Sequence, residues 1–198
     1  QRAIVCVEEV GLGTVSRQIL AAGVQSVLVE KPGGLDVPDI KKVGELATEK
    51  NANVYVGYNR RFYAATKKAE EIIQQDGGVL SFLFEFTEWS HVIADLEKAP
   101  GTKENWFLAN SSHIIDLAFF LGGKPKQLSS YTADSVAWHP QAAIYAGAGL
   151  SEKGALFSYQ ANWKAPGRWW VEVLTSKHRL IFRPIEKLQI QKIGSVAV

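Results

Sequence analysis

Strand-like and helix-like segments alternate through the first sixty residues, and this alternation constrains the fold more than any other feature of the sequence. Apolar runs at 3–7, 26–30 and 53–59 are typical of buried strands. Residues 14–23, and the segment that Asp36 can cap, carry apolar side chains at helical spacing. Short links between such segments require right-handed crossovers, so we expect a parallel sheet. Ligands bind at the carboxyl ends of the strands in such sheets.

The pattern changes after the helix that we expect over residues 61–75. Residues 79–89 alternate in polarity and place Leu80 and three phenylalanines on one face. The elements expected later are a helix from about Asn105 to Leu121, a strand over 155–163 and a hairpin over 169–184.

Two domains follow from these patterns. Residues 1–60 are expected to form part of an α/β parallel sheet, and residues 61–198 an α+β domain with a large, mostly antiparallel sheet. The net charge is +2 and the basic residues are dispersed, which argues against nucleic acid as a partner. No apolar run approaches the roughly 20 residues that cross a membrane.

Cys6 is the only cysteine, so no intrachain disulfide can form. Because Cys6 lies in an apolar run, we expect a buried, unreactive thiol. The first residues lack the charged and apolar regions of a secretory signal, and we expect a cytoplasmic location. The chain contains no methionine and starts with Gln, so we also expect it to be a fragment of a longer protein.

The sequence VLVEKPGG places Glu30, Lys31 and Pro32 where a buried strand ends. Pro32 restricts the backbone at Lys31, so the ammonium is held in one region of space. Such an ammonium can bind a ribose hydroxyl, a phosphate or a substrate oxygen. A solvated charge pair at a strand end is the alternative, and the local sequence does not choose between them.

Asn59, Arg60 and Arg61 follow the third strand, at the same edge of the expected sheet. Two adjacent arginines at a strand-to-helix link can contact an anion, and Arg60 is the better placed. A plain surface location for both is the alternative interpretation.

The segment NSSHIIDLAFF contains His113 and Asp116, which share a face of the expected helix because they lie three residues apart. A histidine near a helix start in apolar company can be a proton acceptor or simply part of the core. The other histidines, His91, His139 and His178, match no metal-binding spacing, and we expect no metal site.

Two further features suggest binding sites. Most of the six tryptophans are expected to pack in the core or between subunits, with Trp106 and Trp163 as exceptions that wall a pocket. The segment from Gly11 to Thr14 resembles a phosphate-binding loop. It lacks the third glycine and the later acidic residue, so we do not accept it as a complete dinucleotide-binding motif.

VLVEKPGG, VYVGYNRRF and HIIDLAFFLGG, in this order and spacing, resemble the glucose–fructose oxidoreductase / inositol dehydrogenase / MocA family over nearly the whole chain. The resemblance implies an N-terminal Rossmann-like dinucleotide-binding domain, of which only the C-terminal part is expected here. It also implies an α+β domain whose open sheet forms a homo-oligomer interface.

The resemblance further implies an NAD- or NADP-dependent oxidoreductase that acts on a sugar or polyol derivative. Lys31 would contact the nicotinamide ribose and the substrate hydroxyl, and His113 would accept the hydroxyl proton. The expected contacts are Glu30, Lys31, Pro32 and Asn59 for the cofactor and Arg60, Asn105, Trp106, Asn110 and Trp163 for the substrate. The family also suggests a cis peptide bond before Pro32.

Two departures from the family pattern bear on function. Family members often carry an acid four residues before the histidine, where this chain has Ala109, and Asn110 is the substitute we expect. The glycine-rich first turn is absent, so this chain alone should bind nicotinamide poorly. A non-enzymatic sugar- or protein-binding module and a purely structural oligomerisation domain therefore remain as alternatives.

Overall fold

The computed structural model describes residues 1–198, which form two compact units. The first unit contains Gln1–Tyr58 and Leu96–Ser112, and the second contains Asn59–Asp95 and His113–Val198. The chain thus passes from one unit to the other three times. No helix in either unit is long and apolar enough to span a membrane.

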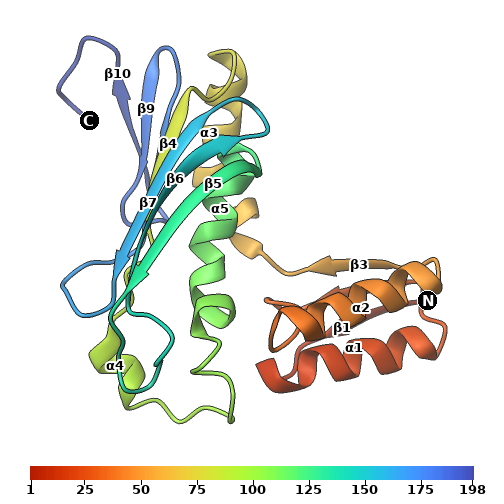
Figure 1. Ribbon diagram of the computed structural model, residues 1–198. Coiled ribbons are helices and arrows are strands. Elements are labelled where there is room, and N and C mark those ends of the chain that lie inside the picture. The colour runs from red at the N-terminus through yellow and green to blue at the C-terminus, as the bar shows by residue number, and fades with distance from the viewer. The chain divides into compact units, whose positions relative to one another are not determined.

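The first unit is built on the three-stranded parallel sheet that the alternation predicted, in the order β1-β2-β3 (Figure 1). Its strands are β1 (Arg2–Val5), β2 (Ser26–Val29) and β3 (Asn53–Val56), and its helices are η1 (Glu9–Gly11), α1 (Leu12–Ala21) and α2 (Val37–Glu49). Val27 and Val29 of β2 pack with side chains of α1 and α2 in a single core. The opposite face of the sheet exposes Ile4, Leu28 and Tyr55, whereas parallel sheets are normally covered on both faces.

Helix α2 begins as expected. Its N-cap, Asp36, accepts a hydrogen bond from the backbone N–H of Asp39 at 2.8 Å. The Asp39 carboxylate does not complete a capping box, because it accepts instead from the N–H of Leu35 at 3.1 Å. Burial alone would raise the pKa of Asp39, but the bonds from Arg17 and Leu35 outweigh it and hold the pKa below its ordinary value.

The expected burial of Cys6 is wrong, because the thiol is exposed. Strand β1 ends at Val5, so the apolar run in the sequence outlasts the strand and Cys6 lies beyond the core.

The remaining part of the first unit, Leu96–Ser112, ends in a π-helical turn, η3 (Phe107–Ser111). The chain then continues into α5 (Ser112–Gly122) of the second unit. The sequence predicted one helix from about Asn105 to Leu121, and the π-helical turn within it was not foreseen. Turns of this kind are frequent at functional sites.

The second unit contains a seven-stranded sheet in the order β10-β9-β8-β4-β7-β6-β5, in which only β4 and β7 are parallel neighbours. Helices α3 and α5 cover one face of it (Figure 1). The strands are β4 (Ser81–Glu85), β5 (Pro125–Ala133), β6 (Ile144–Ser151), β7 (Leu156–Asn162), β8 (Trp170–Leu174), β9 (His178–Phe182) and β10 (Leu188–Lys192). The helices are η2 (Asn59–Phe62), α3 (Ala64–Gln75), α4 (Ser90–Ala94) and α5. The mostly antiparallel sheet is therefore confirmed.

Aromatic rings fill the space between this sheet and α5. Phe119 of α5 contacts Phe82, Phe84 and Phe157 edge-on, with ring centroids 5.0–5.6 Å apart. Leu80 was predicted to share the buried face with Phe82, but it is 62% exposed because it precedes β4 at the edge of the core. Helix α5 ends where predicted, with Gly123 at a φ of 93° and its N–H bonded to the carbonyl oxygen of Phe119.

Candidate functional site

Lys31 lies just beyond the carboxyl end of β2, in the first unit. Its backbone N–H donates to the Glu30 carboxylate at 2.8 Å, and the Lys31-Pro32 peptide bond is cis, as the family resemblance suggested. The Lys31 Nζ donates to the backbone carbonyl oxygen of Ala109 at 2.6 Å. Lys31 is therefore fixed at both its backbone and its ammonium group.

The glycines after Pro32 allow the chain to turn tightly under α2. A Cβ on Gly34 would lie 2.9 Å from the Asp39 carboxylate and 3.1 Å from the backbone nitrogen of Ile40. Pro32, Gly33 and Gly34 are all buried. Packing therefore explains Pro32, Gly33 and Gly34 at the end of VLVEKPGG. The charged pair before them, Glu30 and Lys31, is explained by the placement of the Lys31 ammonium.

The partner of Lys31 belongs to the π-helical turn η3, which lies next to three of the predicted substrate residues. Asn105 precedes the turn and donates to the carbonyl oxygen of Gly101 at 2.9 Å. Trp106 is buried, and Asn110 is half-buried within the turn. Ala109 is buried, and its backbone carbonyl anchors the ammonium of Lys31 within the turn.

A second lysine, Lys98, forms an ion pair with an acid, Glu9, that also interacts with Lys31. Lys98 Nζ lies 3.4 Å from the Glu9 carboxylate. Burial alone would raise the pKa of Glu9, but a backbone hydrogen bond, Lys98 and, more weakly, Lys31 outweigh it and hold the pKa below its ordinary value. Glu9 is therefore ionised at neutral pH.

His113 lies on α5, in the second unit, and its ring contacts that of Trp169, with centroids 6.2 Å apart at 50°. Arg60 also contacts Trp169, with its Cζ 5.2 Å from the ring centroid. The backbone of Arg60 is fixed because its carbonyl oxygen accepts from the buried hydroxyl of Thr66 at 2.8 Å. Two predicted site residues, His113 and Arg60, thus lie against one indole ring.

Four residues beside them, including Trp169 itself, were missed by the sequence interpretation. Arg168 stacks its guanidinium on Trp169 at 4.5 Å and on Trp89 at 4.9 Å, and it pairs with the buried Glu88 carboxylate at 3.1 Å. The only signal was the adjacent Arg168-Trp169 pair just before β8, and Trp169 was assigned with most of the other tryptophans to packing in the core or between subunits.

The other predicted residues of this unit lie elsewhere. Arg61 makes a two-pronged ion pair with Asp116, with its Nε 2.8 Å from Oδ2, and stacks on Phe120 at 5.0 Å. Asn59 is exposed and accepts from the Arg60 Nη1 only at 3.5 Å. Arg61 and Asp116 therefore link η2 to α5, which leaves Arg60 as the arginine available to a ligand.

Trp163 belongs to a separate aromatic cluster. Its indole stacks on Trp138 at 5.3 Å and donates from Nε1 to the carbonyl oxygen of Phe86 at 3.2 Å. Burial of Tyr145, in the same cluster, raises the pKa of its phenol to about 12. Trp163 also lines a hollow of about 750 Å³, together with Trp89, Trp138 and Glu88. This volume is in the range of small-molecule binding sites.

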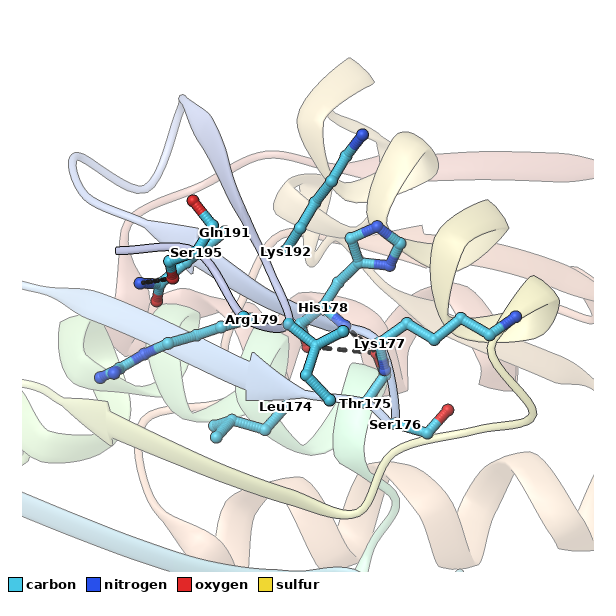
Figure 2. A pocket seen from close by; sticks show the side chains of 11 residues that line it. Leu174, Thr175, Ser176, Lys177, His178, Arg179, Gln191, Lys192 and Ser195 are labelled. Atoms are coloured by element: carbon cyan, nitrogen blue, oxygen red, sulfur yellow. Dashed lines mark hydrogen bonds between the residues drawn. The ribbon is translucent and has the colours of Figure 1, made fainter. Parts of the chain in front are cut away.

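A second hollow, of about 250 Å³, lies at the β8–β9 turn and the end of β10 (Figure 2). Lys192 and His178 are register partners and extend to the same side, whereas Arg179 points away. The His178 Nδ1 lies 2.7 Å from the Asp76 carboxylate, which also accepts from the Thr175 hydroxyl at 2.6 Å. These bonds join the hairpin to the end of α3 and account for His178 as a structural residue.

The residues of the first unit fit only one end of a nicotinamide cofactor. Lys31 offers a fixed ammonium at a strand end, which suits a ribose hydroxyl. The space beside Gly13, in contrast, is already occupied: a Cβ on this residue would overlap the Asp39 carboxylate. That carboxylate would repel a pyrophosphate, so Gly13 serves the packing of α1 against α2. No group of three or more potential metal ligands occurs.

No protein-family model and no curated protein matches this sequence. Solved structures do. The WlbA dehydrogenase from Bordetella pertussis, in complex with NADH and UDP-GlcNAcA, is 17% identical with a TM-score of 0.74 over 91% of this chain and 57% of its own. Levoglucosan dehydrogenase, in complex with NADH and levoglucosan, is 19% identical with a TM-score of 0.76 over 99% of this chain and 58% of its own.

An NAD binding oxidoreductase from Klebsiella pneumoniae is 16% identical, with a TM-score of 0.78 over 99% of this chain and 58% of its own. This chain therefore spans less than two thirds of the length of each of these proteins. The likeness establishes a shared fold: a partial Rossmann-like sheet followed by a large antiparallel sheet, as in dehydrogenases of the glucose–fructose oxidoreductase / inositol dehydrogenase / MocA type.

Proposed function

We propose that this chain is part of a nicotinamide-dependent oxidoreductase that acts on a sugar or polyol derivative. The observation that carries the proposal is the Lys31 ammonium, fixed at a strand end by the carbonyl of Ala109, in a fold shared with NADH-bound sugar dehydrogenases. Strand ends of parallel sheets are where such folds bind their ligands.

The proposed roles follow from the chemistry of the side chains. A bound nicotinamide, from NAD or NADP, would supply or accept the hydride. Lys31 donates to the ribose and to the substrate hydroxyl, and its charge stabilises the oxygen as the proton leaves. His113 accepts that proton. Glu30, Pro32 and Asn59 are the further residues proposed at the cofactor, and Arg60, Asn105, Trp106, Asn110 and Trp163 at the substrate.

A second candidate is a sugar-binding module without enzymatic activity. Two observations favour it: Ala109 stands where the resembled family often has an acid, and the Asp39 carboxylate lies against Gly13. A protein of this kind would bind a sugar with no requirement for a cofactor.

We further propose that the protein forms a homo-oligomer through the open face of the seven-stranded sheet. The face free of helices carries Tyr131 of β5, Ala146 and Ala148 of β6 and Leu156 of β7, all of them exposed. Small and apolar side chains on a broad sheet suit a flat interface. A single cysteine and a nicotinamide cofactor both favour a cytoplasmic location.

The test uses the longest natural polypeptide that contains this sequence. It is incubated with NAD or NADP and with D-glucose, myo-inositol or D-glucuronate, and cofactor reduction is followed by absorbance. Reduction with at least one sugar supports the oxidoreductase. Sugar binding by calorimetry with no cofactor reduction for any substrate would replace it with the binding module.

A further inference from the structure

Four side chains of the second unit form one continuous stack beside His113. Trp89, Arg168, Trp169 and Arg60 alternate ring and guanidinium, with separations of 4.9, 4.5 and 5.2 Å between Cζ atoms and ring centroids. The stack brings two positive charges to the same indole, Trp169. Like charges at this distance repel each other unless something compensates them.

Only one of the two charges is compensated by an ion pair within the protein. Arg168 pairs with Glu88 at 3.1 Å, and the side chain of that glutamate is 1% exposed. Arg60 makes no ion pair, and its hydrogen bond to Asn59 is long, at 3.5 Å. The stack therefore carries a net positive charge that is centred on Arg60.

Arg60 also carries a donor that the protein leaves without a partner. Its Nε is buried and makes no hydrogen bond, and the same is true of the Nε1 of Trp169, which is 6% exposed. Burial lowers the pKa of the Arg60 guanidinium and the Arg168 charge adds to that lowering, whereas Tyr63 and Glu186 oppose it. Buried donors without acceptors are costly, so both atoms favour a ligand that brings an acceptor.

We propose that Arg60, with Trp169 and Arg168 beside it, binds an anionic group, a carboxylate or a phosphoryl group, on the sugar that this protein acts on. The inference rests on the proposed function for the identity of the ligand as a substrate. The planar guanidinium of an arginine can donate two parallel hydrogen bonds to either a carboxylate or a phosphoryl group. Glu88 pairs with Arg168, so Arg60 is the guanidinium of the stack that has no ion pair and can receive an incoming anion.

The position of the stack narrows the substrate further. His113 and Arg60 lie 6.2 and 5.2 Å from the same indole ring. An anionic group bound at Arg60 would therefore lie on the same indole ring as the imidazole that deprotonates the hydroxyl. The hollow of about 750 Å³ beside Trp89 and Glu88 leaves room for the remainder of a larger sugar derivative.

The test measures binding by calorimetry, which needs no turnover. D-glucuronate, D-glucose 6-phosphate, D-glucose and inorganic phosphate are titrated separately into the wild-type protein and into Arg60→Gln, Arg60→Lys and Arg2→Gln variants. Arg2→Gln is the matched control, because it makes the same chemical change at an exposed position of β1. Thermal melting establishes that each variant is folded.

At least one anionic sugar is expected to bind the wild-type protein about tenfold or more tightly than D-glucose, as for a hydrogen bond to a charged group. Arg60→Gln should remove that preference, Arg60→Lys should keep part of it because the charge remains, and Arg2→Gln should keep all of it. The relative affinities of glucuronate and glucose 6-phosphate then identify the anion as carboxylate or phosphoryl.

Equal affinity for neutral and anionic sugars would overturn the inference, as would an Arg60→Gln variant that behaves like Arg2→Gln. Inorganic phosphate binding as tightly as both anionic sugars would overturn the claim that the anion is carried by a sugar. If the protein turns over neutral sugars and binds them as tightly as anionic ones, only the anion-binding inference is refuted and the oxidoreductase stands. If the protein binds anionic sugars more tightly but turns over no sugar, only the proposed oxidoreductase activity is refuted and the anion site stands.

Discussion

The Lys31 ammonium donates to the backbone carbonyl oxygen of Ala109 at 2.6 Å. Ala109 is the position at which the resembled family often has an acidic side chain. The carbonyl is neutral, so it orients Lys31 without cancelling its charge. A carboxylate would orient it too, but as an ion pair that offsets the charge. The bond to Ala109 therefore positions the Lys31 ammonium without adding a negative charge beside it.

Replacing His113 by Gln should lower kcat by roughly 10²- to 10⁴-fold, because the variant keeps a hydrogen-bonding side chain but cannot accept the proton. The limb of the pH–rate profile that reports deprotonation of the histidine should also disappear. His178→Gln is the control, since His178 is accounted for by its bond to Asp76 and is assigned no role at the site. An His113→Gln enzyme with the wild-type pH–rate profile would remove His113 from the proton transfer.

Ala148→Glu should dissociate the proposed oligomer, because it places a charge in the middle of β6 on the exposed sheet face. Light scattering gives the mass of the wild-type protein and the variant at the same concentration. Ala21→Glu, at the exposed end of α1, should leave the mass unchanged. If the wild-type protein is a monomer at high concentration, the proposed interface does not exist.

Asp76→Asn should lower the free energy of unfolding at neutral pH. It should also make that free energy less dependent on pH in the acidic range. Hydrogen bonds from Thr175 and His178 hold the pKa of Asp76 below its ordinary value. Since the folded pKa is the lower one, the stabilisation is complete above the unfolded pKa, about 3.9. It is lost as the pH falls through the folded pKa.

Urea unfolding at a series of pH values measures this effect. The difference between wild type and Asp76→Asn should be constant above about pH 5 and should shrink below about pH 4. Asp95→Asn is the control, because Asp95 is exposed and forms no ion pair. A difference that grows on acidification would show that the sign of the pKa shift is wrong.

Gly13→Ala should destabilise the first unit by about 1–3 kcal/mol, as expected for overpacking. Its Cβ would overlap the Asp39 carboxylate, which Arg17 and the Leu35 N–H hold in place. Gly44→Ala is the matched control: its Cβ meets no other group and it lies within α2, so it should stabilise the helix by about 1 kcal/mol. Urea unfolding distinguishes the two. Equal effects would show that Gly13 is not a packing position.

The sequence was most informative where a feature depends on local chemistry. The three strands and two helices of the first sixty residues follow from apolar periodicity, and the α2 start follows from Asp36 as an N-cap. Lys31 was identifiable because a charged residue before Pro32 interrupts a buried strand. Strand β5 had no such signal, since every residue from Pro125 to Ala133 is exposed and no alternation marks it.

Contacts between distant residues could not be predicted from the sequence. Arg168 and Glu88 are 80 residues apart, and Lys31 and Ala109 are 78 apart. Only the folded chain brings each pair together, so the charge balance around Trp169 is visible in the structure and not in the sequence. The same holds for Arg60 and Arg61, because the ion pair of Arg61 with Asp116 is what separates their roles.

The most direct test of the proposed oxidoreductase is the turnover of Lys31→Met in the longest natural polypeptide that contains this chain. Methionine keeps the length of the side chain and removes its charge. We predict that kcat/KM for sugar-dependent nicotinamide reduction falls by about 10²- to 10³-fold, as for other losses of a transition-state donor. Lys98→Met serves as the control, because Lys98 pairs with Glu9 and is assigned no catalytic role. A Lys31→Met enzyme with wild-type kcat/KM would contradict the role of Lys31 and, with it, the proposed site.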